Sequence, residues 1–399
     1  MCDKRRKVGS LVLSVIASAL AMSTTLVSTI SAQTATIPPR ATKSETRRAL
    51  PATSFYETST PLPPARAGAL IRSEAFDDYD LSADMSALRI LYHSRNASNQ
   101  DVAASAVVLI PAGKPPVGGW PVIAWAHGFS GVARLCAPSL MKNILNGPLL
   151  SMYLSLGYAV VATDYAGLGT YSRYAVVDAE SNAADVMYAI PAAHEGTRLL
   201  GPKWIAIGNS QGAMAAIKIA ERSDDPSYLG SIAISGVASP KDLYERLAQK
   251  PDGMLAVLAY GIKTVFPLFN PSDMFTDKGL ATFEQVESNC GIPGNAAGPR
   301  MLKPDWEKND FVQQFLSRND VGHKPARGPL LVIHGAADAG IPASMTSEIV
   351  GQMCRQHDRV DFEEYPEVDA GSVLGSSVTD QINWIQARFA GRLEASNCK

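Results

Sequence analysis

Residues 203–220 read KWIAIGNSQGAMAAIKIA and contain the features that decide the fold. The run 204–207 is short and apolar, which is typical of a buried strand. Residues 213–220 are rich in Ala, Met and Ile and predict a buried helix. Between them, residues 208–212 read GNSQG and match the pattern G-x-S-x-G. The stretch therefore predicts a strand, a tight turn and a helix.

The predicted turn is suited to presenting Ser210 as a nucleophile. A serine on a sharp strand-to-helix turn has a strained backbone, and its near neighbours must be small. Gly208 and Gly212 meet that requirement. The helix that follows directs N–H groups at the place where negative charge develops during acyl transfer. We therefore predict Ser210 as the catalytic nucleophile and the N–H of Gln211 as one oxyanion-hole donor. The alternative is an ordinary turn serine.

Apolar runs and helical patterns alternate along much of the chain. Further strands are predicted at 88–92, 103–110, 121–126, 158–163, 229–235, 329–333 and 360–365. Further helices are predicted at about 179–195, in a stretch that ends at about 356, and at 378–389. Strands separated by helices predict an α/β fold with a mostly parallel sheet and helices on both faces. Catalytic loops in such sheets follow the carboxyl ends of strands.

Three loops after predicted strands carry polar residues. The loop HGFSG at 127–131 predicts the N–H of Phe129 as the second oxyanion donor, with a plain turn as the alternative. Asp164 is expected to tie its loop to backbone donors without a catalytic role. Residues 334–342 read HGAADAGIP after a late strand. A carboxylate there is placed to orient a catalytic histidine, so Asp338 is the predicted triad acid. A helix cap is the alternative.

Residues 237–327 interrupt the alternation of strands and helices. Within them, Leu255, Leu258, Ile262 and Val265 recur at helical spacing. This helix either packs on the main domain or belongs to a cap whose apolar inner face lines an acyl pocket. Both interpretations can hold together, because a cap must also pack.

The two ends of the chain complete the predicted organisation. Residues 1–32 combine a basic start with an apolar core of about a dozen residues, which predicts a cleavable secretory signal. A membrane anchor is the alternative, but this core is shorter than the ~20 residues that span a bilayer. We expect an extended N-terminal segment at 33–72, a core at 73–236 and 328–399, and the cap at 237–327. The mature protein is then extracellular or periplasmic.

Cysteine content and charge agree with export. Four of the five cysteines lie after the signal, an even number that fits an oxidising compartment. They allow three pairings, and their spacing matches no zinc pattern. The formal net charge of −2 argues against a nucleic-acid partner.

Together these motifs resemble the secretory (fungal-type) lipase family of α/β-hydrolases. The matching pieces, from about residue 53 onward, are HG with CAPS (136–139), DYAGLG (164–169), GNSQG, the long insert and HGAADAGIP. The resemblance implies a secreted hydrolase of fatty-acyl esters with no metal or organic cofactor. It also implies the disulfides Cys136–Cys290 and Cys354–Cys398, the latter joining the last two helices. We expect a monomer that contacts a lipid interface transiently.

The chain departs from that family at the histidine of the triad. The family has this histidine in a YPxxDHG-like stretch, and residues 365–371 read YPEVDAG here, which places Ala370 at the position. We favour a variant or engineered form of an active lipase. The alternatives are a pseudoenzyme that binds acyl ligands, or an unusual base such as Asp369 or His323. A serine peptidase of the prolyl-oligopeptidase type is a further alternative, but neither a propeller nor a charged peptide-terminus site is evident.

Overall fold

The computed structural model describes residues 49–82, 84–249, 252–288, 290–294, 301–392 and 396–398. The expected secretory signal at 1–32 lies outside these residues. Within the described ranges, no helix is long and apolar enough to cross a bilayer.

A nine-stranded sheet organises the described residues, in the order β1-β2-β3-β5-β4-β6-β7-β8-β9. The strands are β1 (Leu70–Ala75), β2 (Ser86–Arg95), β3 (Asp101–Ile110), β4 (Trp120–Ala126), β5 (Ala159–Thr163), β6 (Leu200–Asn209), β7 (Tyr228–Ile234), β8 (Leu330–Gly335) and β9 (Val360–Tyr365). The ladder from β5 through β4 to β9 is parallel, and β1, β2 and β3 pair antiparallel. The predicted mostly parallel α/β architecture is confirmed.

Strand β1 was not predicted, because it begins inside the segment 33–72 that the sequence assigns to an extended arm. It is an edge strand that pairs only with β2, and its residues are half-buried or exposed. An edge strand of this kind lacks the apolar run that marks a buried strand. The arm also packs on the domain through Tyr56, whose hydroxyl lies 2.7 Å from Ser139 Oγ.

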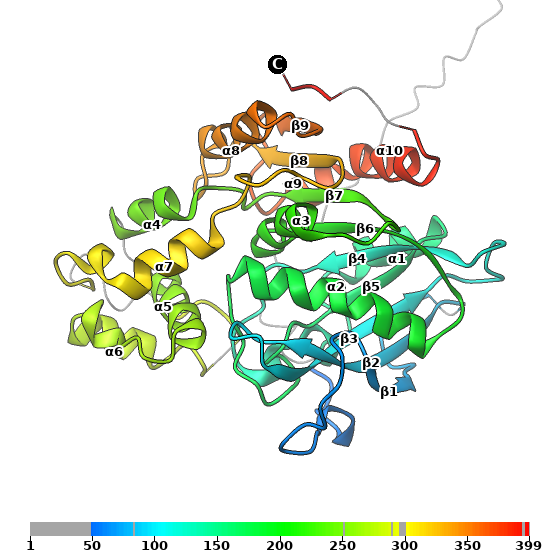
Figure 1. Cartoon of the computed structure of the whole chain (residues 1–399), viewed down its shortest axis with the longest axis horizontal. Helices are drawn as coiled ribbons and strands as arrows, with labels where there is room; N and C mark the ends of the chain where they lie inside the picture. The colour runs from blue at the N-terminus through cyan, green and yellow to red at the C-terminus, as the bar shows by residue number, and fades with distance from the viewer. Residues whose placement is uncertain are drawn as a thin grey trace, which may run out of the picture. The chain divides into compact units, whose positions relative to one another are not determined.

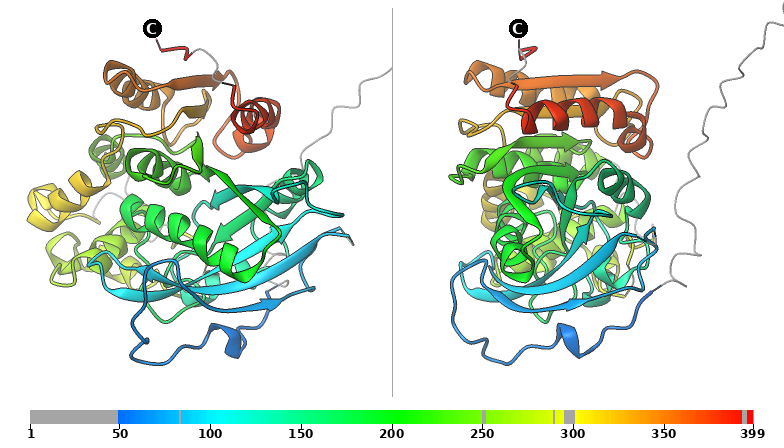
Figure 2. Two further views of the ribbon diagram at one scale, coloured as in Figure 1. Left: turned by 45° about the vertical axis from the view of Figure 1, so that its right-hand side comes forward. Right: turned by 90° about the vertical axis from the view of Figure 1, so that its right-hand side faces the viewer.

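Helices cover both faces of the sheet (Figure 2). On one face lie α2 (Ala179–Gly196), α3 (Gln211–Arg222) and α8 (Ala343–Arg355), and on the other lie α1 (Gly147–Ser155), α9 (Val373–Ser376) and α10 (Val378–Phe389). Each face has its own cluster of buried apolar side chains. The many alanines of α2 and α3 allow these helices to approach the strands closely.

Among the described residues, four α-helices lie between β7 and β8 in the chain and gather beyond one end of the sheet (Figure 1). They are α4 (Pro240–Gln249), α5 (Gly253–Val265), α6 (Asp277–Phe283) and α7 (Asp310–Asn319). The four apolar residues that predicted a helix at α5 are all buried in the cluster that also contains α2 and α3. An acyl pocket along α5 stays a prediction.

Two links fasten these helices to the core. The guanidinium of Arg318 on α7 pairs with Asp178, the N-cap residue of α2, at 2.8 Å. The disulfide Cys136–Cys290 joins the segment that follows β4 to the segment that follows α6. This bond and Cys354–Cys398 confirm the implied pairing. Cys398 lies beyond α10 and not in it, so the second bond joins α8 to the C-terminal tail, which hydrogen-bonds to β9.

Candidate active site

Ser210 occupies a strained turn between β6 and α3. Its backbone dihedrals are φ 56° and ψ −121°, a conformation that L-residues rarely adopt. The N–H of Ser210 donates to the carbonyl of Ile234 at 3.0 Å, which holds the turn at the carboxyl end of the sheet. The residue is exposed, so its side chain is accessible to a substrate.

The two glycines of the motif are required by direct contact. A Cβ on Gly208 would lie 1.9 Å from the carbonyl oxygen of Gly212. A Cβ on Gly212 would lie 2.0 Å from the carbonyl oxygen of Ala126, the last residue of β4. The turn therefore folds only with glycine at both positions, as the sequence motif predicts.

A second turn beside Ser210 was not recognised from the sequence. Ser235 and Gly236 follow β7 with φ 56° and 74°, and a Cβ on Gly236 would lie 2.5 Å from the carbonyl oxygen of Ser210. The signal was the pair Ser-Gly at the end of the predicted strand 229–235. This glycine allows the loop after β7 to pack against the nucleophile turn.

The loop after β4 reaches the nucleophile from the other side. A Cβ built on Gly128 would lie 3.4 Å from Cβ of Ser210, which places the neighbouring Phe129 beside the site. Burial lowers the pKa of His127 to about 4, so its ring is neutral at physiological pH and contacts the carbonyl of Asp164 at 3.2 Å. Both oxyanion candidates, Phe129 and Gln211, thus flank Ser210, and their donor roles stay predictions.

Asp164 ties its loop to a backbone donor, as the sequence predicted. Its carboxylate accepts the backbone N–H of Ser139 at 2.8 Å and the hydroxyl of Ser105 at 2.6 Å. The residue is fully buried, and burial raises its pKa to about 6. It lies under the loop and serves as a structural anchor.

Asp338 lies on the loop after β8, and its side chain is 9% exposed. Its Oδ1 accepts the backbone N–H groups of Gly340 at 2.8 Å and Ile341 at 3.0 Å. Arg246, on helix α4, donates to the carbonyls of Ala339 and Gly340 and so braces this loop from the cap. These bonds fix one carboxylate oxygen in a defined orientation.

Ala370 lies on the exposed loop between β9 and α9. This loop packs on the loop of Asp338, because the N–H of Ala337 donates to the carbonyl of Val368 at 3.0 Å. A Cβ on Gly335 would lie 2.4 Å from that same carbonyl oxygen. The parallel strands β8 and β9 thus bring the loop of the acid and the loop of position 370 together. The methyl side chain of Ala370 can neither accept nor donate a proton.

Four of the six histidines make polar contacts to groups other than Ser210. His93 pairs with Asp101, His127 contacts backbone carbonyls, His323 pairs with Asp320, and His334 lies 3.0 Å from Thr346 Oγ1. His323, one of the alternative bases, is thus engaged with a carboxylate on the connection between α7 and β8. The site combines a strained serine with an oriented carboxylate and carries alanine at the position expected for the base.

The family model described as secretory lipase matches residues 145–397, a range that includes Ser210, Asp338 and Ala370. Among solved structures, Candida antarctica lipase A in its closed state is similar with 19% identity and a TM-score of 0.76, covering 88% of this chain and 89% of that chain. The rice cell wall degrading esterase LipA from Xanthomonas oryzae is similar with 20% identity and a TM-score of 0.65, covering 82% and 98%. No curated protein sequence matches.

Proposed function

The chain belongs to the secretory lipase family, and from this premise we propose that it is a secreted serine hydrolase of fatty-acyl esters whose rate is limited by the missing base at Ala370. The observation that carries the proposal is the turn of Ser210, with φ 56° and ψ −121° at the carboxyl end of β6. A strained, exposed serine at that position is the arrangement from which α/β-hydrolases attack carbonyl carbon.

The proposed reaction is acyl transfer through Ser210. Its Oγ attacks the ester carbonyl, and the tetrahedral oxyanion accepts hydrogen bonds from the N–H groups of Phe129 and Gln211. Collapse of this intermediate releases the alcohol and leaves an acyl-serine, which water then hydrolyses.

Removal of the proton from the serine hydroxyl is the difficult step. In the family arrangement Asp338 orients a histidine that accepts this proton, and Ala370 offers no acceptor. The proton must then pass to solvent. Loss of a triad member leaves roughly 10³–10⁴-fold acceleration over water, which comes from the oxyanion hole and substrate binding. We therefore expect slow turnover of activated esters.

The apolar helix α5, which lies between β7 and β8 in the chain, supports an acyl substrate. Leu255, Leu258 and Ile262 of α5 are buried in the same apolar cluster as helix α3, which begins next to Ser210. We propose that the acyl chain of the substrate lies against this apolar layer.

Ala370 also favours a second candidate, a secreted protein that binds acyl ligands without turning them over. Labelling with a fluorophosphonate probe separates the two functions, because rapid covalent modification requires an activated serine. The hydrolase predicts measurable labelling of Ser210 and slow hydrolysis of p-nitrophenyl esters, both lost in Ser210→Ala. A protein that binds fatty acid but is neither labelled nor hydrolytic would contradict the hydrolase and support the binder.

A further inference from the structure

The peptide group that joins Val176 to Val177 lies between a cap helix and the nucleophile turn. A Cβ built on Gly261 of α5 would lie 2.4 Å from the carbonyl oxygen of Val176, so the cap helix packs directly on this peptide group. The N–H of the same group belongs to Val177 and donates to Oε1 of Gln211 at 3.3 Å. One planar, rigid unit therefore contacts the cap at its oxygen and the residue after Ser210 at its nitrogen.

Val177 adopts a backbone conformation that its side chain disfavours. Its φ is 53°, in the left-handed region, where a β-branched residue is a genuine outlier. A strained residue of this kind persists only where its surroundings fix it, and such residues cluster where a geometry is needed for function. The contacts on both sides of Val177 must therefore supply that restraint.

The residue after Val177 is fixed by the cap. Asp178 is fully buried, and its two carboxylate oxygens accept hydrogen bonds from Nε and Nη2 of Arg318 at 2.8 and 3.1 Å. Its Oδ2 also accepts the backbone N–H of Ser181 at 3.1 Å, which caps helix α2. A bidentate pair of this kind fixes orientation as well as position. Helix α7 of the cap thus restrains the chain directly after the strained residue.

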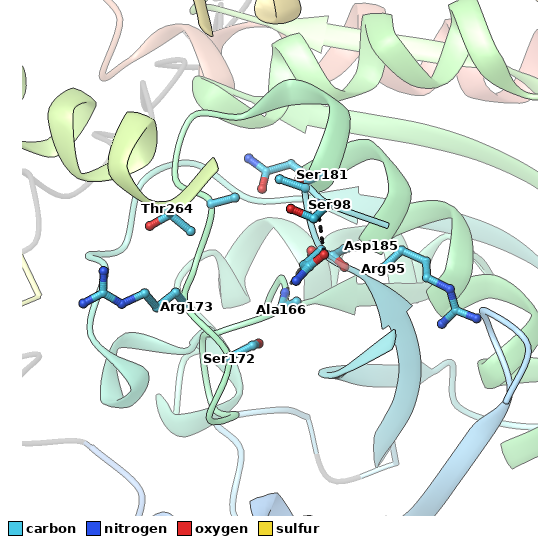
Figure 3. A pocket seen from close by; sticks show the side chains of 12 residues that line it. Arg95, Ser98, Ala166, Ser172, Arg173, Ser181, Asp185 and Thr264 are labelled. Atoms are coloured by element: carbon cyan, nitrogen blue, oxygen red, sulfur yellow. Dashed lines mark hydrogen bonds between the residues drawn. The ribbon is translucent and has the colours of Figure 1, made fainter. Parts of the chain in front are cut away.

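The loop that leads into Val177 is not packed on every side. A cavity of about 200 Å³ lies beside it, and its lining includes Ser172 and Arg173 of the loop, Ser181 at the start of α2 and Thr264 of α5 (Figure 3). Side chains do not fill this side of the loop. The position of its last residues therefore depends on the contacts to the cap and to the nucleophile turn.

The side chain of Gln211 is buried next to Ser210. It is 8% exposed, and the hydroxyl of Tyr174 lies beside it. Gln211 is the first residue of α3, and its backbone N–H is one of the two predicted oxyanion donors. A donor of this kind works only when its nitrogen lies about 2.7–3.1 Å from the developing oxyanion. A side chain fixed at Oε1 limits how far the N–H of the same residue can turn away from that position.

From these contacts we propose that the cap sets the geometry of the oxyanion hole. Arg318 and Gly261 are positioning residues that act through Val177, whose N–H fixes the Gln211 side chain. The proposal rests on the acyl-transfer function proposed above, and it gives the cap a role in the rate of that reaction. The two are coupled because a cap that leaves its place frees Asp178 and lets Val177 relax from its strained conformation.

The first test is kinetic and uses Ala370→His as the parent enzyme. Arg318→Ala should lower kcat for a p-nitrophenyl ester by about tenfold with little change in KM, because a displaced oxyanion donor stabilises the transition state less. Affinity for a trifluoromethyl ketone, whose adduct with serine carries an oxyanion, should fall by a similar factor, while fatty acid binding stays unchanged. Arg318→Lys should recover part of the rate, since an ammonium still pairs with Asp178.

A double-mutant cycle tests whether the cap acts through Gln211. Gln211→Met keeps the backbone N–H and the length of the side chain but removes the acceptor of the Val177 N–H. This variant should lower kcat by about fivefold, and Arg318→Ala should then have little further effect. Additive effects would show that Arg318 acts by another route and would overturn the proposal.

A second readout needs no catalysis. The backbone amide resonance of Gln211, observed in ¹⁵N-labelled protein, should shift in Gly261→Ala, because the added methyl displaces the carbonyl of Val176. Gly351→Ala is the matched control and should leave the resonance in place. Gly351 also lies in a helix, α8, and a Cβ there meets only the side chain of Arg355, at 3.5 Å.

The two readouts separate failure of this proposal from failure of the proposed function. Gly261→Ala tests the proposal even if Arg318→Ala fails to fold for lack of a counter-ion to Asp178. An unchanged Gln211 resonance in the folded variants would overturn the proposal, whether or not the enzyme is active. An Ala370→His enzyme without hydrolysis would contradict the proposed function, and the resonance would still decide this inference.

Discussion

The backbone N–H of Ala337 donates a hydrogen bond to the carbonyl of Val368 at 3.0 Å. This bond joins the loop of Asp338 to the loop of Ala370 and sets the two positions side by side at the ends of β8 and β9. A histidine at position 370 would therefore emerge beside a carboxylate whose Oδ1 is already held by Gly340 and Ile341.

We predict that Ala370→His raises kcat for p-nitrophenyl ester hydrolysis by about 10²–10⁴-fold. The imidazole would accept the serine proton, and Asp338 would orient it. The matched controls are Asp338→Asn and Ser210→Ala in the same background, and both should remove the gain. Equal activity of the parent protein and Ala370→His would show that another residue is the base. Loss of binding in the variant would show that the loop does not tolerate the ring.

Gly212→Ala should abolish labelling of Ser210 and lower the free energy of unfolding by about 3 kcal/mol or more. The added methyl would lie 2.0 Å from the carbonyl oxygen of Ala126, where only a shift of backbone relieves the clash. Gly294→Ala is the control, because a Cβ there meets nothing within 4 Å. Urea unfolding and probe labelling measure both effects. A stable, labelled Gly212→Ala protein would contradict the close approach of β4 and α3.

The stability of the protein should depend on the charge of Asp185. Burial raises the pKa of this carboxyl from its ordinary value of 3.8 to about 7. Between these values the folded state binds more protons than the unfolded state, so the free energy of unfolding falls as pH rises through this window. Asp185→Asn does not titrate. The free energy of unfolding of this variant, measured relative to that of the parent protein, should therefore rise by about 4 kcal/mol from about pH 4 to about pH 8.

The exposed Asp277→Asn provides the comparison for this measurement. Denaturant unfolding at several pH values gives the difference between each variant and the parent protein. A constant difference for Asp185→Asn would mean that this carboxyl titrates normally in the folded state.

The two disulfides should differ in their effect on function. Replacing either pair by serine should lower the free energy of unfolding by about 2–5 kcal/mol, with the larger effect for Cys136–Cys290 because it closes the longer loop. That bond also fixes the loop after β4, since a Cβ on Gly131 would lie 2.7 Å from Cys136 Sγ. Hydrolysis by folded protein in the Ala370→His background should fall for Cys136/Cys290→Ser and be retained for Cys354/Cys398→Ser. Equal activities would contradict a role of the first disulfide in the site.

Local sequence patterns predicted the parallel sheet and the turn of Ser210, because each depends on residues adjacent in the chain. The edge strand β1 was missed, since pairing on one side leaves it without a buried apolar run. The contact of Gly236 with the Ser210 carbonyl was also missed, because it depends on how β7 is placed next to β6. A local sequence pattern carries no information on how two strands are placed next to each other.

Buried polar residues show the same limit. Asn182 and Asp185 lie in a helix whose other residues are mainly small and apolar, and the sequence alone does not say which polar side chains of such a helix are buried. The family resemblance implied both disulfides, yet it placed Cys398 on the last helix, whereas the tail continues past α10 and along β9.

Arg246 links the cap to the loop of the predicted catalytic acid, Asp338, and this link can be tested separately. Its guanidinium donates to the carbonyls of Ala339 at 2.9 Å and Gly340 at 3.1 Å, although the side chain is exposed. In the Ala370→His background, Arg246→Ala should lower kcat by about fivefold with little change in KM, because it loosens the acid without touching the substrate. Arg246→Lys should restore part of the rate, since an ammonium still donates to a carbonyl. A rise in KM alone would instead place Arg246 in substrate binding, and unchanged kinetics would show that the loop keeps its geometry without the cap.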